Sequence, residues 1–600
     1  MSDFQGRLPA FLAETFRLNP TVATAIGEHA HDHRWPDLTA AGRAERLAST
    51  VRWLAEFQAM TDLSADDAID RDLLIGELEA ARFADTELCE EAWNPLEWVY
   101  LIGGGLFTLN AREFAPLADR LVSTAGRLEA LPAVLDAARE TLVGHAGRPV
   151  ARFQTETALD RLPGLGELIA EALAAADVAA PDDPAVAALS ARLTAAAATA
   201  RIALTGFETH LREVVLPASE GEGRIGAALF AAKLRHTMRS ETLTPERILG
   251  GAEREFRAVR AEMVRLARDL WPDWRPDGPI PVDENALVRG VLDAIAAEHP
   301  KAEDLLDFCR AENARIEAFC LQRDVVGLVD EPLEIQWTPV FLRASGGAML
   351  SSPGPLDKGQ KAFFAITPMP DDWSAEQRDS NLREDNDRML RLLTIHEAVP
   401  GHYLQGVYAN RCPSLVRAIF ASGLFAEGWA VYVTQVMMDV GYGADDPALM
   451  LTHWKFYLRS ITNAMIDAKI HCEGMTKEEA VSLMVDGGFQ EEAEALAKFD
   501  RARLSSTQLS TYFAGSIEMW EIEREVRRRA AIASGDPRGA LAVPEPRVVG
   551  GFGETPGFTY RPHLESVVAH GSPPTSLLRR ILLGQEVAEA DIRLVDENGE

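Results

Sequence analysis

The fold and chemistry of this chain depend on the stretch Thr394-Ile395-His396-Glu397-Ala398-Val399-Pro400-Gly401-His402-Tyr403-Leu404-Gln405. It contains two histidines, and a glutamate directly follows the first of them. Two imidazoles and a neighbouring carboxylate are the minimum that a catalytic zinc ion with a general base beside it requires. The stretch therefore predicts a metal site with His396 and His402 as ligands and Glu397 as the base.

The spacing of the two histidines does not fit an unbroken helix. Zinc-peptidase histidines commonly lie at i and i+4, about 40° apart, whereas i and i+6 would be about 120° apart. Pro400 cannot donate an N–H to the carbonyl of His396, and Gly401 can adopt backbone angles closed to other residues. We therefore expect the helix to open between Glu397 and His402 and bring both imidazoles to one point. The alternative is a broken core helix that happens to contain histidines.

A third ligand is needed, because catalytic zinc takes three protein ligands and keeps one open position. The best candidate is Glu427, which stands in the apolar run Phe425-Ala426-Glu427-Gly428-Trp429-Ala430-Val431-Tyr432. A carboxylate among apolar residues is costly to bury without a positive partner, and a metal ion would supply one. The alternative is a glutamate that faces solvent.

A helix expected near residues 453–471 carries Arg459, Asp467 and His471 on one face. Positions 459 and 467 are about 80° apart around the helix axis, and positions 467 and 471 about 40°. Asp467 is a candidate to orient a metal-bound imidazole, and His471 to donate to a developing oxyanion. A purely structural pair among these residues is the alternative.

Further donors follow downstream in Arg501, Gln508 and Tyr512. Tyr512 is a candidate to hydrogen-bond the tetrahedral intermediate, and Arg501 to hold a substrate carboxylate through two hydrogen bonds. Taken singly, such residues are more often packed or solvated than functional.

Composition places the chain among ordinary soluble proteins large enough for more than one lobe. It has 600 residues, of which 47% are hydrophobic and 25% charged. It has no apolar run long enough to span a membrane and no signal-peptide pattern at its start. The five cysteines are scattered and odd in number, which suits a reducing compartment. These features predict a cytoplasmic protein.

The charge balance is strongly acidic, with 60 Lys and Arg against 92 Asp and Glu and a net charge of −32. So acidic a chain is a poor binder of nucleic acid or anionic membranes, and we expect neither as a partner. The excess charge is interpreted as serving solubility. An acidic cleft that favours cationic or neutral peptides is the alternative.

The expected architecture is mainly α. From Ser2 to about Pro217, apolar residues recur at three- and four-residue spacing, which predicts helix after helix. A flexible break at 219–223 is a candidate boundary. It separates an N-terminal helical lobe, 1–218, from a metal-site lobe, 224–600, and we expect the two lobes to form one compact unit.

Two segments, 333–337 and 362–367, alternate in the manner of strands. We expect a small sheet at the rim of the metal cleft, where an edge strand could hydrogen-bond an extended peptide; a structural hairpin is the alternative. Single elements are predicted as a loop over 271–281, a helix over 374–399 and a long Gly- and Pro-rich loop over 535–557.

Three histidines near the N-terminus, His29, His31 and His33, alternate along the chain. Alternating histidines can bind a metal ion. A polar surface loop before Pro36 is the preferred interpretation.

Together these residues resemble the bacterial family called domain of unknown function 885, whose members look like helical zinc peptidases. The pattern His-Glu-x-x-Pro-Gly-His-x-x-Gln matches from His396 to Gln405, and Glu-Gly-Trp-Ala-x-Tyr matches from Glu427 to Tyr432. The remaining matches are Arg459, Asp467, His471, Arg501, Gln508, Tyr512 and Gly515, and Leu18 to Thr24 with Gly27 and His29. The resemblance implies a large metallopeptidase-like fold with a deep central cleft, and it adds Gln405 to the residues that support the site or bind substrate.

The chain departs from the family pattern at two places. Ser506-Thr507 stand where Pro-Gly often precedes the late Gln, and the residues around His563 only approximate a Phe-His-Asp signature. The role of His563 is therefore open, and the substrate range is expected to differ from that of other members.

The leading hypothesis is a metal-dependent hydrolase that cleaves peptide bonds of short or unstructured peptides. Zinc and Glu397 would activate a water, and Tyr512 with His471 would stabilise the oxyanion. Zinc is the expected cofactor, although manganese and cobalt also accept this ligand set. The alternatives are a zinc amidohydrolase for a non-peptide amide or modified amino-acid conjugate, and a non-catalytic scaffold stabilised by zinc. The sequence determines neither the oligomeric state nor the peptide end that is recognised.

Overall fold

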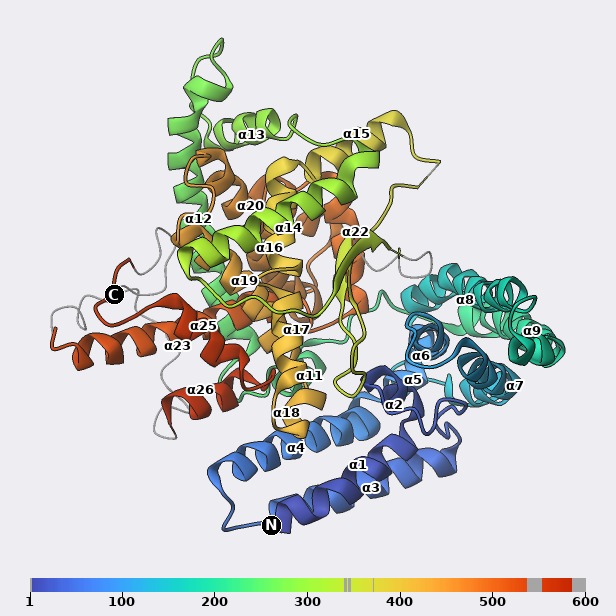
Figure 1. The fold of residues 1–600 in the computed structure, drawn as a ribbon. Helices are drawn as coiled ribbons and strands as arrows, with labels where there is room; N and C mark the ends of the chain where they lie inside the picture. Colours follow the sequence, from blue (N-terminus) through green and yellow to red (C-terminus); the bar gives the residue numbers. More distant parts are fainter. Residues whose placement is uncertain (1–2, 339–342, 344–346, 371, 537–552, 585–600) are drawn as a thin grey trace. The chain divides into compact units, whose positions relative to one another are not determined.

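The computed structural model describes residues 3–338, 343, 347–370, 372–536 and 553–584 (Figure 1). The fold is mainly helical with one small three-stranded sheet, as the sequence predicts. The chain divides into two compact units. Described residues up to Arg224 and the segment Pro353–Lys361 belong to the first, and Ile225–Thr338, Gly347–Ser352 and described residues from Ala362 onward to the second. That two lobes form one compact unit stays a prediction.

The described part of the first unit is built of helices, with a core of Leu, Ala and Phe side chains. The helices are α1 Asp3–Leu18, α2 Pro20–Ile26, α3 Ala40–Gln58, α4 Ala65–Phe83, α5 Glu90–Trp93, α6 Pro95–Asn110, α7 Leu117–Thr141, α8 Arg152–Ala179, α9 Pro184–His210 and α10 Leu216–Ala218. Helix α9 begins as expected, because Asp183 accepts hydrogen bonds from the first backbone N–H groups and Pro184 occupies the first helical position.

The histidine His29 fastens the segment Pro353–Lys361 to the rest of the first unit. Its Nδ1 lies 2.9 Å from Asp32 and its Nε2 lies 3.0 Å from Asp357, and its ring stacks on Phe114 at 3.8 Å. The preferred interpretation as a polar loop holds for this segment, which forms turns and coil before Pro36, and within it both ring nitrogens of His29 are bound to carboxylates. In the described part of the chain, none of the three alternating histidines joins a metal-binding group.

His29 should make the stability of the protein depend on pH. Burial lowers the pKa of His29, but the hydrogen bonds to Asp32 and Asp357 outweigh burial and raise the pKa from 6.5 to about 9. Protonated His29 therefore stabilises the folded state fully below pH 6.5, and this contribution is lost as pH rises through about 9. In denaturant titrations, His29→Gln should flatten the fall in unfolding free energy between these pH values.

The matched control for that experiment is His31→Gln, because His31 neighbours the same turn. It should keep the pH dependence of the wild type. An unchanged pH profile in His29→Gln would contradict the role of this histidine.

The second unit holds the sheet and most of the predicted site. Its strands are β1 Leu333–Trp337, β2 Ala348–Ser351 and β3 Ala362–Ile366. Its helices are α11 Ala227–Met238, α12 Pro245–Trp274, α13 Glu284–Ile295, α14 Leu305–Arg323, α15 Ala375–Glu384, α16 Asp387–Glu397, α17 His402–Arg411, α18 Leu415–Ile419, α19 Gly423–Asp439, α20 Pro447–Ala468, α21 Lys477–Ser482, α22 Glu492–Leu504, α23 Ser510–Ala533, α25 Tyr560–Val568 and α26 Thr575–Leu583. Helix α16 packs against α14, α19 and α20 (Figure 1).

The sheet has the order β1-β3-β2, with β3 parallel to β1 and antiparallel to β2. Strands β1 and β3 confirm the two predicted strands. Strand β2 was not predicted, because its four residues lie in a stretch rich in Gly, Ser and Pro that is typical of a loop. It is an edge strand of the described sheet, so one side of its backbone faces away from β3.

Two helix boundaries differ from the prediction. The expected helix over 374–399 is two helices, because Asn386 accepts hydrogen bonds at the start of α16 and ends the continuity with α15. The expected loop after Trp271 begins later, since α12 continues to Trp274 with Pro272 inside it. Most of the predicted loop over 535–557 lies outside the described residues.

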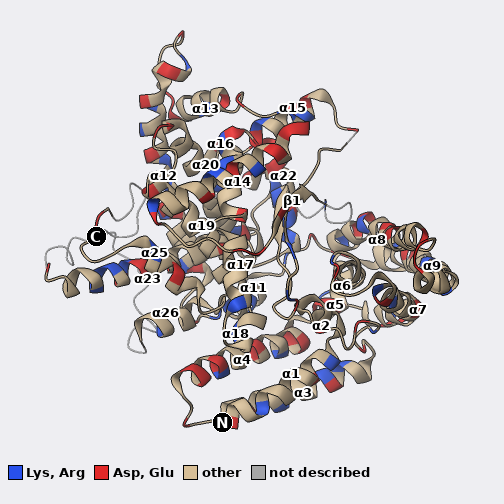
Figure 2. Cartoon of the chain, viewed as in Figure 1, with Lys and Arg blue, Asp and Glu red and all other residues tan. Residues whose placement is uncertain are grey.

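Charged side chains lie on helices throughout both units (Figure 2). Acidic residues are the more frequent, in keeping with the net charge of −32. Among the described residues, every helix is too short or too polar to span a bilayer.

Candidate metal centre

The helix opens at the Pro-Gly pair, as the sequence predicts. Helix α16 ends at Glu397 and α17 begins at His402. A Cβ on Gly401 would lie 1.9 Å from the carbonyl oxygen of His396, so only glycine fits this turn. The indole of Trp429 donates a 2.9 Å hydrogen bond to the carbonyl of Pro400 and fastens the turn to α19.

The turn brings His396, His402 and Glu427 to one place. One ligand atom from each residue lies within 4.8 Å of the other two, and the imidazole rings are nearly perpendicular at 85°. Glu427 Oε2 lies 3.5 Å from His402 Nε2 and 4.0 Å from His396 Nε2. His396 is buried, while His402 and Glu427 are partly exposed, so solvent can approach the group from their side.

These distances fit a divalent metal ion. In a tetrahedral site with bonds of about 2.1 Å, neighbouring ligand atoms are about 3.4 Å apart. The observed separations of 3.5 and 4.0 Å are close to this ligand–ligand distance. Small rotations of the side chains would bring them to it. Two imidazoles and a carboxylate are also the donor types that catalytic zinc sites use.

The protonation of the three groups suits a cation at their centre. Burial and the charge of His402 lower the pKa of His396 to about 3, so this imidazole is neutral. Burial lowers the pKa of His402, but the hydrogen bond and charge of Glu427 outweigh burial and raise it. Burial raises the pKa of Glu427, but the hydrogen bond and charge of His402 outweigh burial and lower it. His402 and Glu427 therefore stabilise each other's charged form, and a bound cation would take over the stabilisation of the Glu427 carboxylate.

Glu397 lies beside this group without belonging to it. Its carboxyl is buried, and burial raises its pKa to about 7. The backbone N–H of Leu350 in β2 donates a hydrogen bond to the carboxylate. The edge strand thus borders the candidate metal centre. No sequence signal marked Leu350, because a backbone N–H is present at every non-proline residue.

Two glycines bring α19 and α23 into backbone contact beside the site. A Cβ at Gly428 would lie 2.3 Å from the carbonyl carbon of Gly515, and one at Gly515 would lie 2.2 Å from the Leu424 oxygen. Gly428 follows Glu427 directly, and Gly515 follows Tyr512 by three residues. The close approach therefore sets the distance between the third candidate ligand and the tyrosine.

Gly428→Ala should disturb both stability and the site. The added methyl cannot fit without separating the two helices, so we expect a loss of about 1–3 kcal/mol in unfolding free energy. We also expect weaker metal binding, because Glu427 would move away from the imidazoles. Thermal unfolding and metal titration measure the two effects.

Gly423→Ala is the matched control, because it lies in the same helix and a Cβ there meets nothing within 4 Å. Equal stability and metal affinity in the two alanine variants would contradict the importance of the α19–α23 contact.

Three residues predicted from the later part of the chain gather at Glu427. The Gln508 amide donates to Glu427 Oε1 at 3.4 Å, and the Tyr512 hydroxyl is also hydrogen-bonded to Glu427. Arg501 Nη2 lies 3.0 Å from Gln508 Oε1 and 3.2 Å from the Tyr512 hydroxyl. Burial and the charge of Glu427 raise the pKa of Tyr512, so its hydroxyl remains a donor.

His471 is not placed as predicted. Its Nδ1 accepts a hydrogen bond from the Ile225 N–H at 3.2 Å, and its Nε2 lies 3.0 Å from the Ala502 carbonyl. A π-helical turn over Lys469–Glu473 follows α20 and changes the direction in which this ring points. The prediction of an oxyanion donor is wrong, because both nitrogens are bound to the backbone.

Asp467 is also not an orienter of a metal-bound imidazole. Its carboxylate is fully buried and accepts hydrogen bonds from the Thr507 N–H at 3.0 Å and from the N–H and hydroxyl of Ser510. It therefore fixes the start of α23, the part of the chain that carries Gln508 and Tyr512. Asp467 is directed to α23 and not to the candidate ligands because unpaired N–H groups at the start of a helix attract a carboxylate.

Arg459 and Gln405 point to other partners. Arg459 lies 2.7 Å from Glu494 and 3.5 Å from Glu384, so it balances buried carboxylates. The Gln405 amide donates to the Ser572 hydroxyl. In the described structure neither residue hydrogen-bonds the candidate ligands, and that they support the site or bind substrate stays a prediction.

His563 has a structural role. Its Nε2 lies 3.1 Å from the Tyr432 hydroxyl, which in turn donates to Glu523 at 2.6 Å. Burial lowers the pKa of His563 to about 4, so the ring is neutral. The histidine thus packs the C-terminal helix α25 against α19.

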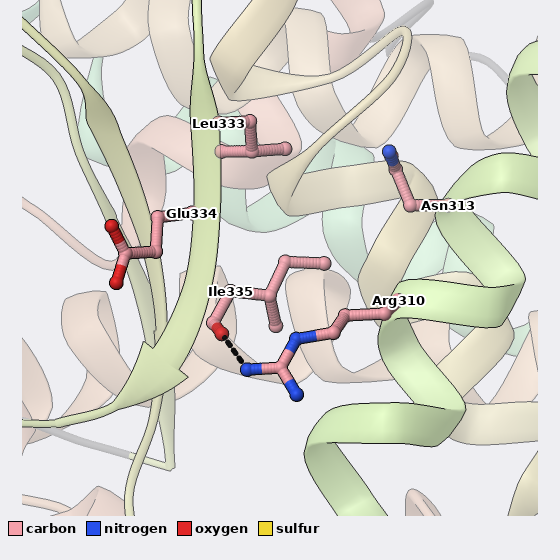
Figure 3. Close-up of a pocket in the computed structure, with 5 residues that line it drawn as sticks. All are labelled: Arg310, Asn313, Leu333, Glu334 and Ile335. Atoms are coloured by element: carbon pink, nitrogen blue, oxygen red, sulfur yellow. Dashed lines mark hydrogen bonds between the residues drawn. The ribbon is translucent and has the colours of Figure 1, made fainter.

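A separate cavity of about 250 Å³ lies between α14 and β1 (Figure 3). It is lined by Arg310, Asn313, Leu333, Glu334 and Ile335, and Arg310 donates to the Ile335 carbonyl at 2.7 Å. None of the predicted site residues lines it, so it is distinct from the candidate metal centre.

A known family model matches most of this chain. The family model described as "Bacterial protein of unknown function (DUF885)" matches residues 20–542, which include every candidate metal ligand and the predicted base. The chain belongs to the DUF885 family. The resemblance seen in the sequence is therefore confirmed. No curated protein matches this DUF885 chain.

Two solved structures are similar to this DUF885 chain. One is "a putative lipoprotein of unknown function" from Shewanella oneidensis, 29% identical, with a TM-score of 0.77 over 97% of this chain and 100% of that chain. The other is described as a "putative lipoprotein" from Colwellia psychrerythraea, 16% identical, with a TM-score of 0.75 over 97% and 99%. At that identity, the second likeness concerns the fold alone.

Proposed function

We propose that this DUF885 protein is a zinc-dependent hydrolase of peptide bonds. The observation that carries the proposal is the convergence of His396, His402 and Glu427 within 4.8 Å, beside a buried Glu397 that is not part of the group. Ligands for an ion and a separate base are the two components that metal-dependent hydrolysis requires.

The number of ligands favours a catalytic ion over a structural one. Structural zinc sites take four protein ligands, whereas catalytic sites take three and leave a position for water or substrate. In the part of the chain that the structure describes, the group has three members. This count argues against the alternative of a zinc-stabilised scaffold.

Each residue has a role in the proposed reaction. His396, His402 and Glu427 would hold the ion, which when bound would lower the pKa of a water and polarise the substrate carbonyl. Glu397 would accept a proton from the attacking water and pass it to the leaving nitrogen, a task that suits a carboxyl with a pKa of about 7. Tyr512 would donate a hydrogen bond to the developing oxyanion.

The edge strand β2 would orient the substrate. Leu350 donates to Glu397, so the edge strand runs beside the base. An extended peptide can add to such an edge through backbone hydrogen bonds. The deep cleft expected from the family resemblance would then lie along β2, and it would admit short or unstructured peptides. This use of backbone hydrogen bonds favours a peptide over the alternative non-peptide amide.

Elemental analysis of the purified protein and a mass-spectrometric survey of peptide mixtures test the proposal. We expect about one zinc ion per chain and cleavage that a chelator stops and zinc restores. A protein that binds zinc but leaves every peptide of the mixture intact would overturn it.

The cytoplasm remains the location proposed from the composition of this chain. The two similar solved structures are described as putative lipoproteins, so the membrane fraction is the alternative location for this chain. Fractionation of the native cells decides between the two locations.

A further inference from the structure

Arg501 is a cation beside the candidate metal centre. In the described part of the chain, no carboxylate forms an ion pair with its guanidinium, and only Nη2 makes hydrogen bonds. The other two nitrogens, Nε and Nη1, are not among the buried polar atoms that lack a partner, so solvent reaches them. An arginine uses its fork of donors most strongly on a carboxylate. Among the described residues, Glu427 and Glu494 act on the charge of Arg501 but form no ion-pair contact with it.

The neighbouring cations differ from Arg501 in this respect. Lys498 lies 3.4 Å and Arg459 2.7 Å from Glu494. Arg503 pairs with Asp500 and lies over the ring of Phe499. In a chain with 92 acidic and 60 basic residues, carboxylates are plentiful, so an unpaired guanidinium in this cluster needs a separate explanation.

We propose that Arg501 binds the C-terminal carboxylate of a peptide substrate and makes the protein a carboxypeptidase-type enzyme. This inference rests on the proposed hydrolase function and specifies its substrate class. The carboxylate would accept hydrogen bonds from Nε and Nη1, while Nη2 stays bound to Gln508 and Tyr512. Water would add its hydroxyl to the acyl carbon, and its proton would go to the nitrogen of the released C-terminal fragment.

The position of Arg501 determines how many residues are released. The Tyr512 hydroxyl bonds both to Arg501 and to Glu427, so two hydrogen bonds separate the guanidinium from a candidate ligand. One residue of extended chain spans about 3.3–3.6 Å. A carboxylate on Arg501 therefore leaves room for one or two residues between the chain end and the scissile carbonyl.

The test compares peptides that differ only at the C-terminus. With zinc-loaded wild-type protein, a free-acid peptide should have a kcat/KM about 100-fold above that of its C-terminal amide, as expected for a lost charge-assisted pair. Blocking the N-terminus should change little. Mass spectrometry should show release of one or two residues. A third peptide, amidated but ending in Asp, tests whether a side-chain carboxylate can substitute.

The variant Arg501→Gln should lose this discrimination. The ratio of kcat/KM for the free acid to kcat/KM for the amide should fall from about 100 to about 1, because any effect on Tyr512 is common to both peptides. Arg503→Gln is the matched control, since it removes a guanidinium from the same helix and should keep the preference for the free acid. Zinc content and melting temperature identify any variant that fails to fold, and the comparison of peptides on wild-type protein needs no variant.

The possible outcomes separate this inference from the proposed function. Equal cleavage of acid and amide, equal cleavage of the Asp-ending amide, or internal cleavage would overturn the binding of the C-terminal carboxylate by Arg501 and leave hydrolysis intact. Loss of both activities in Arg501→Gln with normal zinc content would make Arg501 a support for Tyr512 only. If zinc-loaded wild-type protein cleaves none of the peptides, the proposed function itself fails.

Discussion

Replacing Glu397 with Gln is expected to lower kcat for peptide hydrolysis by about 1,000-fold while zinc stays bound. The amide keeps the shape of the side chain and can still interact with the Leu350 N–H, but it cannot accept a proton from water. Zinc should remain, because Glu397 is not one of the three residues that converge. Steady-state kinetics on a cleaved peptide and elemental analysis of the same sample measure the two quantities.

The control is Glu376→Gln, which removes an exposed carboxylate from α15. It should keep the kcat and zinc content of the wild type. Glu397→Gln protein that turns over substrate at the wild-type rate would exclude this carboxylate as the base. Loss of zinc in that variant would instead show that Glu397 contributes to zinc binding.

The centre of the site could be predicted because its cause is local. Pro400 and Gly401 have backbone properties that follow from residue type alone, and these end one helix and start the next within a few residues. The apolar setting of Glu427 is likewise visible in the sequence, because a buried carboxylate needs a partner. The mainly helical fold follows from the spacing of apolar residues.

The surroundings of the site depend on tertiary contacts that helix periodicity does not contain. An ideal helix puts Asp467 and His471 on one face, but the π-helical turn after Ala468 changes the direction of His471. Asp467 is directed by unpaired N–H groups at the start of α23, a segment 40 and more residues away. Sequence periodicity cannot identify such partners.

The edge strand β2 was missed for a related reason. A strand of four residues is too short for a clear alternation of apolar and polar side chains. Strand β2 pairs with β3, which follows it only after a loop. Its contact with the site is the backbone N–H of Leu350, which donates to Glu397. A contact made by a backbone N–H cannot be predicted from residue type, because almost every residue has this group. Tyr512, Gln508 and Arg501 could be predicted because their contacts are made by side chains.

Replacing His402 with Ala should abolish both zinc binding and its stabilising effect. For wild-type protein, zinc at about 1,000 times its Kd should add about 4 kcal/mol to the free energy of unfolding. A chelator should therefore lower the melting temperature, and zinc should restore it. In His402→Ala, only His396 and Glu427 remain as ligands, so zinc should produce little shift and hydrolysis should fall to background.

His33→Ala serves as the control, because this exposed histidine lies outside the group of three. It should keep the full response of the melting temperature to zinc. If zinc stabilises His402→Ala as much as the wild type, the ion binds elsewhere and the convergence of His396, His402 and Glu427 has another cause. If zinc stabilises neither protein, the ion pair between His402 and Glu427 is sufficient to explain why these side chains meet.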